Sequence, residues 1–138
     1  MTDWEGSQAI QGALRDANRQ FPPSANRMLD VATCCIKFSK EYKLVVHELE
    51  RFIRKAPNVQ LKVSGVFAID VTLYNARKKF GKREDSNKLT KRMGEKLAGI
   101  MAHVNVADLN GEEHRLLSKV LAGWIAREYF PESVNQCF

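Results

Sequence analysis

Asp70 is an acidic residue in an otherwise apolar run, Gly-Val-Phe-Ala-Ile-Asp-Val over residues 65–71. An ionised carboxylate in such surroundings needs a hydrogen-bond donor or an opposite charge, because an unpaired buried charge is costly. Two interpretations follow. Asp70 braces a neighbouring helix through a salt bridge, or it lines a groove and accepts a hydrogen bond from a ligand.

A second candidate site lies at Pro23-Ser-Ala-Asn-Arg-Met28, which follows the helix-breaking pair Pro22-Pro23. The start of a helix exposes unpaired N–H groups and carries positive potential. Ser24 and Arg27, one turn apart, add a hydroxyl and a forked cation, a combination suited to a phosphate. The alternative is that Ser24 is an ordinary N-cap.

Catalytic and metal chemistry find little support in this sequence. The histidines at 47, 103 and 114 have no metal-ligand spacing, and no Cys-x-x-Cys pair, glycine-rich phosphate loop or nucleophile elbow is present. The three cysteines, two of them adjacent, are expected to be free thiols. We therefore expect a binding module without cofactor or metal, and no enzyme.

The elements that position these residues all read as helices. Apolar spacings of three and four residues, with caps and breakers, predict helices at about 3–19, 24–38, 40–55, 86–103 and 111–128, and a short one at 132–136. The second is expected to turn Met28, Leu29, Val31, Ala32, Cys35 and Ile36 inward. Expected caps are Asp3, Ser24, and either Asp108 or Asn110.

The segment from Leu61 to Phe80 is rich in strand-forming residues, yet its apolar positions also fit a helix. Because no second strand exists to pair with it, we predict a largely buried helix, with Gly81 as its C-cap.

The length and the net charge of the chain limit the kinds of domain organisation and partner to be expected. The 138 residues suit one domain spanning 1–138, with no apolar run long enough for a membrane span and no signal peptide expected. The net charge of +6 favours anionic partners. The basic stretch Arg77–Lys96 is a candidate for an auxiliary RNA contact or, in a rival reading, for anionic lipid.

Several segments together resemble the CTD-interacting domain, the module that binds the C-terminal heptad-repeat tail of RNA polymerase II. They are Ser24-x-x-Arg27-Met28, Tyr42-Lys43-x-Val45-Val46, the run at 65–71, Phe80-Gly81 and Leu121-Ala-Gly-Trp124. In this family the central helix reads approximately Gly-Leu-Tyr-Val-Ile-Asp-Ser. The resemblance covers about residues 5–130, and the order and spacing of its motifs are more specific than any single motif.

The resemblance implies an all-α, right-handed superhelix of about eight helices, similar to VHS and ENTH domains. It also implies a nuclear protein that binds the phosphorylated tail of RNA polymerase II and recruits RNA-processing or termination machinery.

Site residues follow from the same resemblance. Asp70 would accept a hydrogen bond from the heptad tyrosine. The remaining peptide-binding residues would be Phe67, Tyr74, Leu116, Lys119 and Val120. A phosphate on the fifth-position serine would lie at Ser24, Asn26 and Arg27, and one on the second-position serine would meet Lys119.

Four positions depart from the family pattern. Ser64 replaces the usual proline before the glycine of the central helix. Phe67 lacks the hydroxyl of the usual tyrosine, Val71 replaces a serine, and Lys119 replaces an arginine and so loses its bidentate fork. These departures leave an alternative open, a divergent helical adaptor for another phosphopeptide or, as in ENTH and VHS domains, for a membrane or trafficking ligand.

Overall fold

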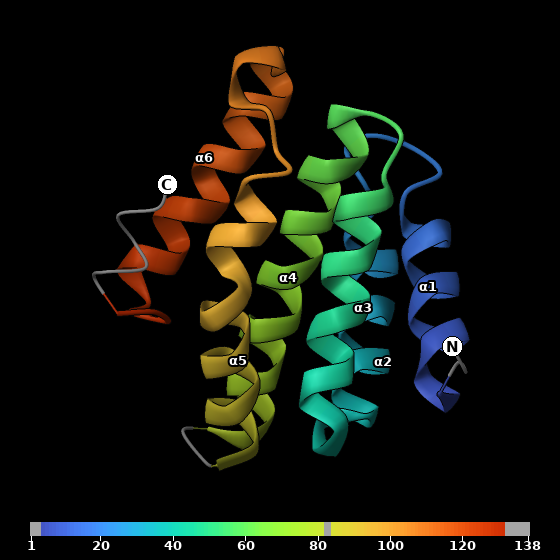
Figure 1. The fold of residues 1–138 in the computed structure, drawn as a ribbon, viewed down its shortest axis with the longest axis vertical. Coiled ribbons are helices and arrows are strands. Elements are labelled where there is room, and N and C mark those ends of the chain that lie inside the picture. Colours follow the sequence, from blue (N-terminus) through green and yellow to red (C-terminus); the bar gives the residue numbers. More distant parts are fainter. Residues whose placement is uncertain (1–3, 82–83, 132–138) are drawn as a thin grey trace.

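The computed structural model describes residues 4–81 and 84–131, which form six α-helices and two short 3-10 helices (Figure 1). The α-helices are α1 (Glu5–Ala17), α2 (Ala25–Lys37), α3 (Tyr42–Lys55), α4 (Val59–Phe80), α5 (Glu84–Met101) and α6 (Gly111–Ala126). The 3-10 helices are η1 (Ser39–Glu41) and η2 (Val106–Asp108). The described residues contain no strand, so the all-α prediction is confirmed for them. The expected helix at 132–136 lies outside them, and the count of about eight helices and the superhelix remain predictions.

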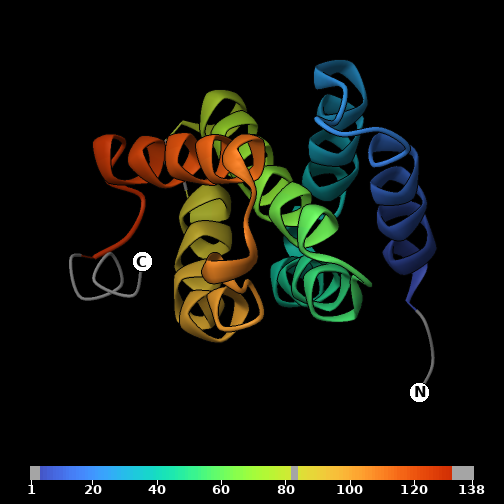
Figure 2. The same cartoon turned by 90° about the horizontal axis from the view of Figure 1, so that it is seen from above.

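The helices form two rows that meet at α4. Viewed from above, α3 and α5 lie on one side of α4, and α2 and α6 lie on the other (Figure 2). The contacts agree, because α4 touches α2, α3, α5 and α6, and α3 touches both α1 and α5. We call the side formed by α2, α4 and α6 the groove face.

The central helix α4 confirms the prediction for residues 61–80. Its buried positions include runs of neighbours such as 63–66 and 68–69, so it is covered on almost every side. Burial by four helices outweighs the strand preference of its β-branched residues. It begins two residues earlier than expected because the Asn58 side chain accepts a hydrogen bond from the Leu61 N–H at 2.9 Å. It ends at Gly81, whose φ of 65° suits a glycine.

Gly65 sets how closely α3 approaches α4. A methyl group at this position would overlap the side chain of Ile53 and press against Phe52. The absence of a side chain at Gly65 therefore lets α3 and α4 pack closely at this point.

The other helix boundaries need small corrections. Trp4 occupies the N-cap position of α1, and the predicted cap Asp3 lies outside the described residues. For α6 the structure selects Asn110, whose side chain accepts from the Glu113 N–H at 2.9 Å while Glu113 accepts from the Asn110 N–H at 3.0 Å. This reciprocal capping box excludes Asp108 as the cap.

The prediction that Leu29 points inward is wrong. The inward face of α2 consists of Met28, Val31, Ala32, Cys35 and Ile36, whereas Leu29 is 47% exposed. Leu29 follows Met28 by one residue, about 100° around the helix, and so lies at the edge of the buried stripe, two turns before Ile36. Cys35 behaves as a buried apolar residue, since burial raises the pKa of its thiol to about 12.

A buried carboxylate joins α1 to α3, which the sequence did not suggest. Glu48 is 0% exposed. Its oxygens accept hydrogen bonds from the Trp4 indole at 3.1 Å and from the Gln11 side chain at 2.9 Å, and Arg51 lies 3.6 Å away. These partners offset the cost of burying the charge.

None of the described helices is both long enough and apolar enough to cross a lipid bilayer.

Candidate functional site

Asp70 lies on α4 where α4 meets α6, and its side chain is 17% exposed. Oδ1 accepts a hydrogen bond from the Trp124 indole at 3.0 Å, and an Arg127 guanidinium nitrogen lies 3.5 Å from the same oxygen. Burial raises the pKa of Asp70, and the Trp124 hydrogen bond and the Arg127 charge oppose that rise. Asp70 therefore does brace a neighbouring helix, as the first interpretation expected.

The other oxygen of Asp70 leaves room for the second interpretation. Within residues 4–81 and 84–131, Oδ2 accepts no hydrogen bond. A carboxylate can accept through both oxygens. Asp70 is thus oriented through one oxygen and able to receive a donor through the other.

Trp124 and Arg127 are the two site residues that sequence reasoning missed. Trp124 is fully buried, and a buried indole N–H requires an acceptor. The sequence signals only that a buried tryptophan needs an acceptor, and it does not show that Asp70 is that acceptor. Arg127 lies one turn further along, with its guanidinium 5.2 Å from the centre of the Tyr74 ring. Its backbone carbonyl accepts a hydrogen bond from Arg77 at 3.1 Å.

The predicted peptide-binding residues fall on α4 and α6, but not all of them offer surface. Phe67 is half-buried and lies one turn before Asp70, whereas Tyr74, one turn after it, is 46% exposed. On α6, Lys119 is exposed and Leu116 is half-buried. Val120 is only 4% exposed, so it contributes to the core and offers a ligand little apolar surface.

A hollow of about 670 Å³ lies between α2 and α4 on the groove face. It is lined by Leu29, Thr33, Ile36 and Lys37 of α2 and by Asn75, Lys78 and Lys79 of α4. Asn75 and Lys78 follow Asp70 by five and eight residues, so the hollow begins about one to two turns along α4. The exposed Leu29 thus acquires a role as one wall of a basic, partly apolar depression.

The predicted phosphate site lies at the first turn of α2. Ser24 occupies the N-cap position, but its hydroxyl makes no capping hydrogen bond, and no acidic residue lies in the first turn. Asn26 and Arg27 are exposed, and Arg27 has no ion-pair partner among the described residues. This helix start therefore presents uncompensated positive charge.

Comparison with known proteins identifies the family. The family model of the CID domain matches residues 8–137. This chain belongs to the CID-domain family. Domains of this family bind the C-terminal domain of RNA polymerase II, and the proteins that carry them are binding or adaptor proteins.

Two curated relatives agree with the family match. The mouse and human proteins named SR-related and CTD-associated factor 8 are each 27% identical to the chain over 133 residues. The alignments cover 96% of this chain and 10% of each relative, so the chain spans about a tenth of their length. The resemblance found in the sequence is confirmed.

Within the part of the chain that the structure describes, no group of three histidine, cysteine or acidic side chains could hold a metal ion.

Proposed function

We propose that this CID domain binds the phosphorylated heptad tail of RNA polymerase II on its groove face, and that it thereby recruits RNA-processing or termination machinery in the nucleus. The observation that carries the proposal is the state of Asp70. One oxygen is fixed by the hydrogen bond from Trp124, and the other accepts no hydrogen bond within the described residues. The tyrosine hydroxyl of the heptad is a donor of the right kind for that second oxygen.

Apolar and aromatic surface beside Asp70 supports the same ligand. Tyr74 and Leu29 are two of the large hydrophobic residues that the domain leaves exposed, at 46% and 47%. Tyr74 lies one turn from Asp70, and Leu29 lines the hollow between α2 and α4. A repeat that contains tyrosine and proline can cover such surface, which gives binding energy in addition to the charge contacts.

Two separate sites could pair with a phosphate group, and each contains one cation. Arg27, with Ser24 and Asn26, offers a site at the start of α2, and Lys119 offers a separate one on α6. A lysine pairs with phosphate as a point charge and not as a bidentate fork, so we expect the Lys119 contact to be the weaker one. Binding by a single heptad should be modest, because a disordered peptide loses conformational entropy on docking, and repeated heptads should strengthen it.

The test is a fluorescence-anisotropy titration with three two-heptad peptides, namely unmodified, phosphorylated on the second-position serines, and phosphorylated on the fifth-position serines. Asp70→Asn keeps an acceptor for Trp124 but removes the negative charge of the carboxylate. It should lower the affinity for all three peptides by about tenfold or more. Arg27→Ala should weaken only the fifth-position phosphopeptide, and Lys119→Ala only the second-position one.

Lys43→Ala, an exposed lysine on α3, is the matched control and should change none of the affinities. Circular dichroism should show that each variant stays helical. If no peptide binds at high micromolar concentration, the polymerase-tail proposal is wrong. Sedimentation with anionic vesicles then tests the ENTH-like alternative.

A further inference from the structure

The helices α3 and α5 lie side by side, on the side of α4 opposite α2 and α6 (Figure 2). A basic trough runs between their side chains. It consists of two hollows of about 330 and 400 Å³ that share Lys43 and Arg92 as lining residues. We call it the α3–α5 seam and define it by Lys43, Lys88, Lys91, Arg92 and Lys96. The seam contains no residue predicted for the peptide site.

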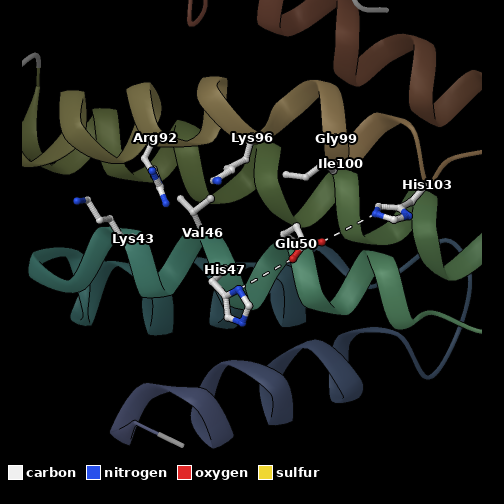
Figure 3. Close-up of a pocket in the computed structure, with 9 residues that line it drawn as sticks. All are labelled: Lys43, Val46, His47, Glu50, Arg92, Lys96, Gly99, Ile100 and His103. Atoms are coloured by element: carbon white, nitrogen blue, oxygen red, sulfur yellow. Dashed lines mark ion pairs between the residues drawn. The ribbon is translucent and has the colours of Figure 1, made fainter. Parts of the chain in front are cut away.

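The cations of the seam are arranged in a line. Lys88, Arg92 and Lys96 are four residues apart on α5, so they lie on one side of the helix at intervals of about 6 Å. Lys43 faces them from α3. Figure 3 shows Lys43 extending from α3, and Arg92 and Lys96 from α5, into the gap beside Val46.

The described carboxylates of the seam, Glu50 and Glu95, leave part of this positive charge unpaired. Glu50 pairs with Arg54 at 2.9 Å, and the rings of His47 and His103 lie 4.0 and 3.9 Å from its carboxylate (Figure 3). Glu95 lies 3.4 Å from one terminal nitrogen of Arg92. The Nε of Arg92 is nevertheless buried and has no hydrogen-bond partner among the described residues. Lys43 and Lys96 have no ion-pair partner among the described residues, so the seam keeps positive charge that its own carboxylates do not pair.

Three-dimensional structure divides the basic stretch Arg77–Lys96 in two. Arg77 lies over the Tyr129 ring, 4.7 Å from its centre, and Lys78 and Lys79 line the hollow on the groove face. The cations from Lys88 onward line the seam, where Lys43 joins them from 45 residues earlier in the chain than Lys88. The positive charge of the seam therefore arises because α3 and α5 pack side by side, and the linear stretch alone does not account for it.

We propose that the α3–α5 seam binds the phosphate backbone of a single-stranded nucleic acid without regard to its sequence. A long trough with cations at regular intervals fits a strand of phosphates. The residues of large exposed apolar surface, Leu29, Leu44, Tyr74, Val106 and Ile125, do not line it, so the ligand is recognised by charge. A membrane surface is flat and favours apolar insertion, which a recessed trough without a large exposed apolar side chain does not offer. The proposal extends beyond tail binding and does not depend on it.

The test is a titration of fluorescein-labelled oligouridine RNA of twelve nucleotides, and of the matching oligothymidine DNA, over a series of salt concentrations. Both should bind. The slope of log affinity against log salt should be about −0.7 for each phosphate contacted, or roughly −2 to −3 for three or four contacts. Lys43→Glu combined with Lys96→Glu should lower the affinity about tenfold or more.

Lys78→Glu combined with Lys79→Glu is the matched control. It changes net charge by the same amount within the same linear stretch, but on the groove face, and should reduce nucleic-acid affinity by about twofold or less. All four lysines are exposed, so these variants are expected to fold, and their thermal unfolding checks it.

Several outcomes would overturn the proposal. One is an equal loss of affinity in the two double variants, which would mean diffuse charge attraction. Another is binding of inositol hexakisphosphate or of anionic vesicles at the seam while neither oligonucleotide binds. A third is displacement of the nucleic acid by an unlabelled phosphorylated heptad peptide, which would place both ligands in one site. If the oligonucleotides bind and no heptad peptide does, the seam proposal stands although the tail proposal fails.

Discussion

Two carboxylates in this domain, Glu48 and Asp70, each accept a hydrogen bond from an indole N–H. They differ in how deeply they are buried and in how many of their oxygens accept hydrogen bonds. Glu48 on α3 is fully buried, and both of its oxygens are paired, by Trp4 on one side and by Gln11 on the other. Asp70 on α4 is 17% exposed, and only its Oδ1 is paired. The same kind of pair therefore does two things. Where both carboxylate oxygens accept hydrogen bonds, as in Glu48, the pair ties two helices together. Where only one oxygen does so at the surface, as in Asp70, the pair ties two helices together and also retains an acceptor for a ligand.

The difference shows why a buried carboxylate alone does not mark a binding site. The cost of burying charge is offset in both places, by hydrogen bonds and by a nearby arginine. What separates the two is whether a lone pair remains uncommitted at a surface that also presents exposed aromatic rings and cations. Tyr74 and Arg127 supply these beside Asp70.

Removal of Glu48 should give the largest effect. Glu48→Ala leaves the Trp4 indole without its acceptor and the Gln11 amide without one of its two, and should destabilise the domain by about 3 kcal/mol, measured by urea denaturation. Asp70→Ala, at the partly exposed pair, should cost less than half as much. Equal losses would contradict the distinction between the two pairs.

Gly65 lies where the helix that carries Glu48 meets the helix that carries Asp70. Gly65→Ala should destabilise by about 1–3 kcal/mol, because the added methyl overlaps Ile53 and forces α3 away from α4. Gly99→Ala is the matched control. A methyl at Gly99, on α5, meets no atom within 4 Å, so this change should stabilise by about 0.5–1 kcal/mol through helix propensity. Thermal and urea unfolding measure both, and a loss of stability in Gly99→Ala would contradict the packing described for α5.

Substitution of the indole donor tests how far Trp124 orients Asp70. Trp124→Phe keeps an aromatic ring but removes the N–H, and should destabilise by about 1–2 kcal/mol. It should also raise the pKa of Asp70 further, because the hydrogen bond that lowers it is lost. Peptide affinity should fall, since Asp70 is no longer held in place.

Trp4→Phe is the corresponding change at the saturated pair. There Glu48 keeps Gln11 and Arg51, so peptide affinity should stay unchanged. NMR titration of the aspartate carboxyl and anisotropy measure the two effects, and an equal loss of peptide affinity in both variants would remove the case for Trp124 as a positioning residue.

The smallest effect is expected from pH. Because burial raises the pKa of Asp70 in the folded protein, the folded state retains this proton at pH values where the unfolded chain has lost it. The contribution of Asp70 to the free energy of unfolding should therefore fall as pH rises from about 4 through its folded pKa. Peptide binding should change in the opposite direction, because the ionised carboxylate is the better acceptor.

Urea denaturation over a pH series measures the free energy of unfolding, and anisotropy over the same series measures the peptide affinity, for wild type and Asp70→Asn. The difference in stability between them should change with pH in the stated direction, and identical pH profiles would count against a raised pKa.

The all-α fold class, the family and most helix boundaries could be predicted from the amino-acid sequence. Apolar spacings, prolines and Gly81 are local signals, and each acts within one or two turns of the residue that carries it. Even the ambiguous segment at 61–80 could be assigned, because a strand needs a partner and the sequence offered none. The motif around Asp70 named the residue on which the peptide proposal rests.

Only the tertiary structure decided what surrounds those residues. The Trp124–Asp70 pair spans 54 positions and the Trp4–Glu48 pair spans 44, so no local pattern shows that either pair meets or which oxygen stays open. Packing also turned Leu29 outward, buried Val120, and split one basic stretch between two faces of the molecule. The physical reason is the same in each case. Burial and charge pairing depend on which helices lie side by side, and that is fixed by the whole core and not by any one segment.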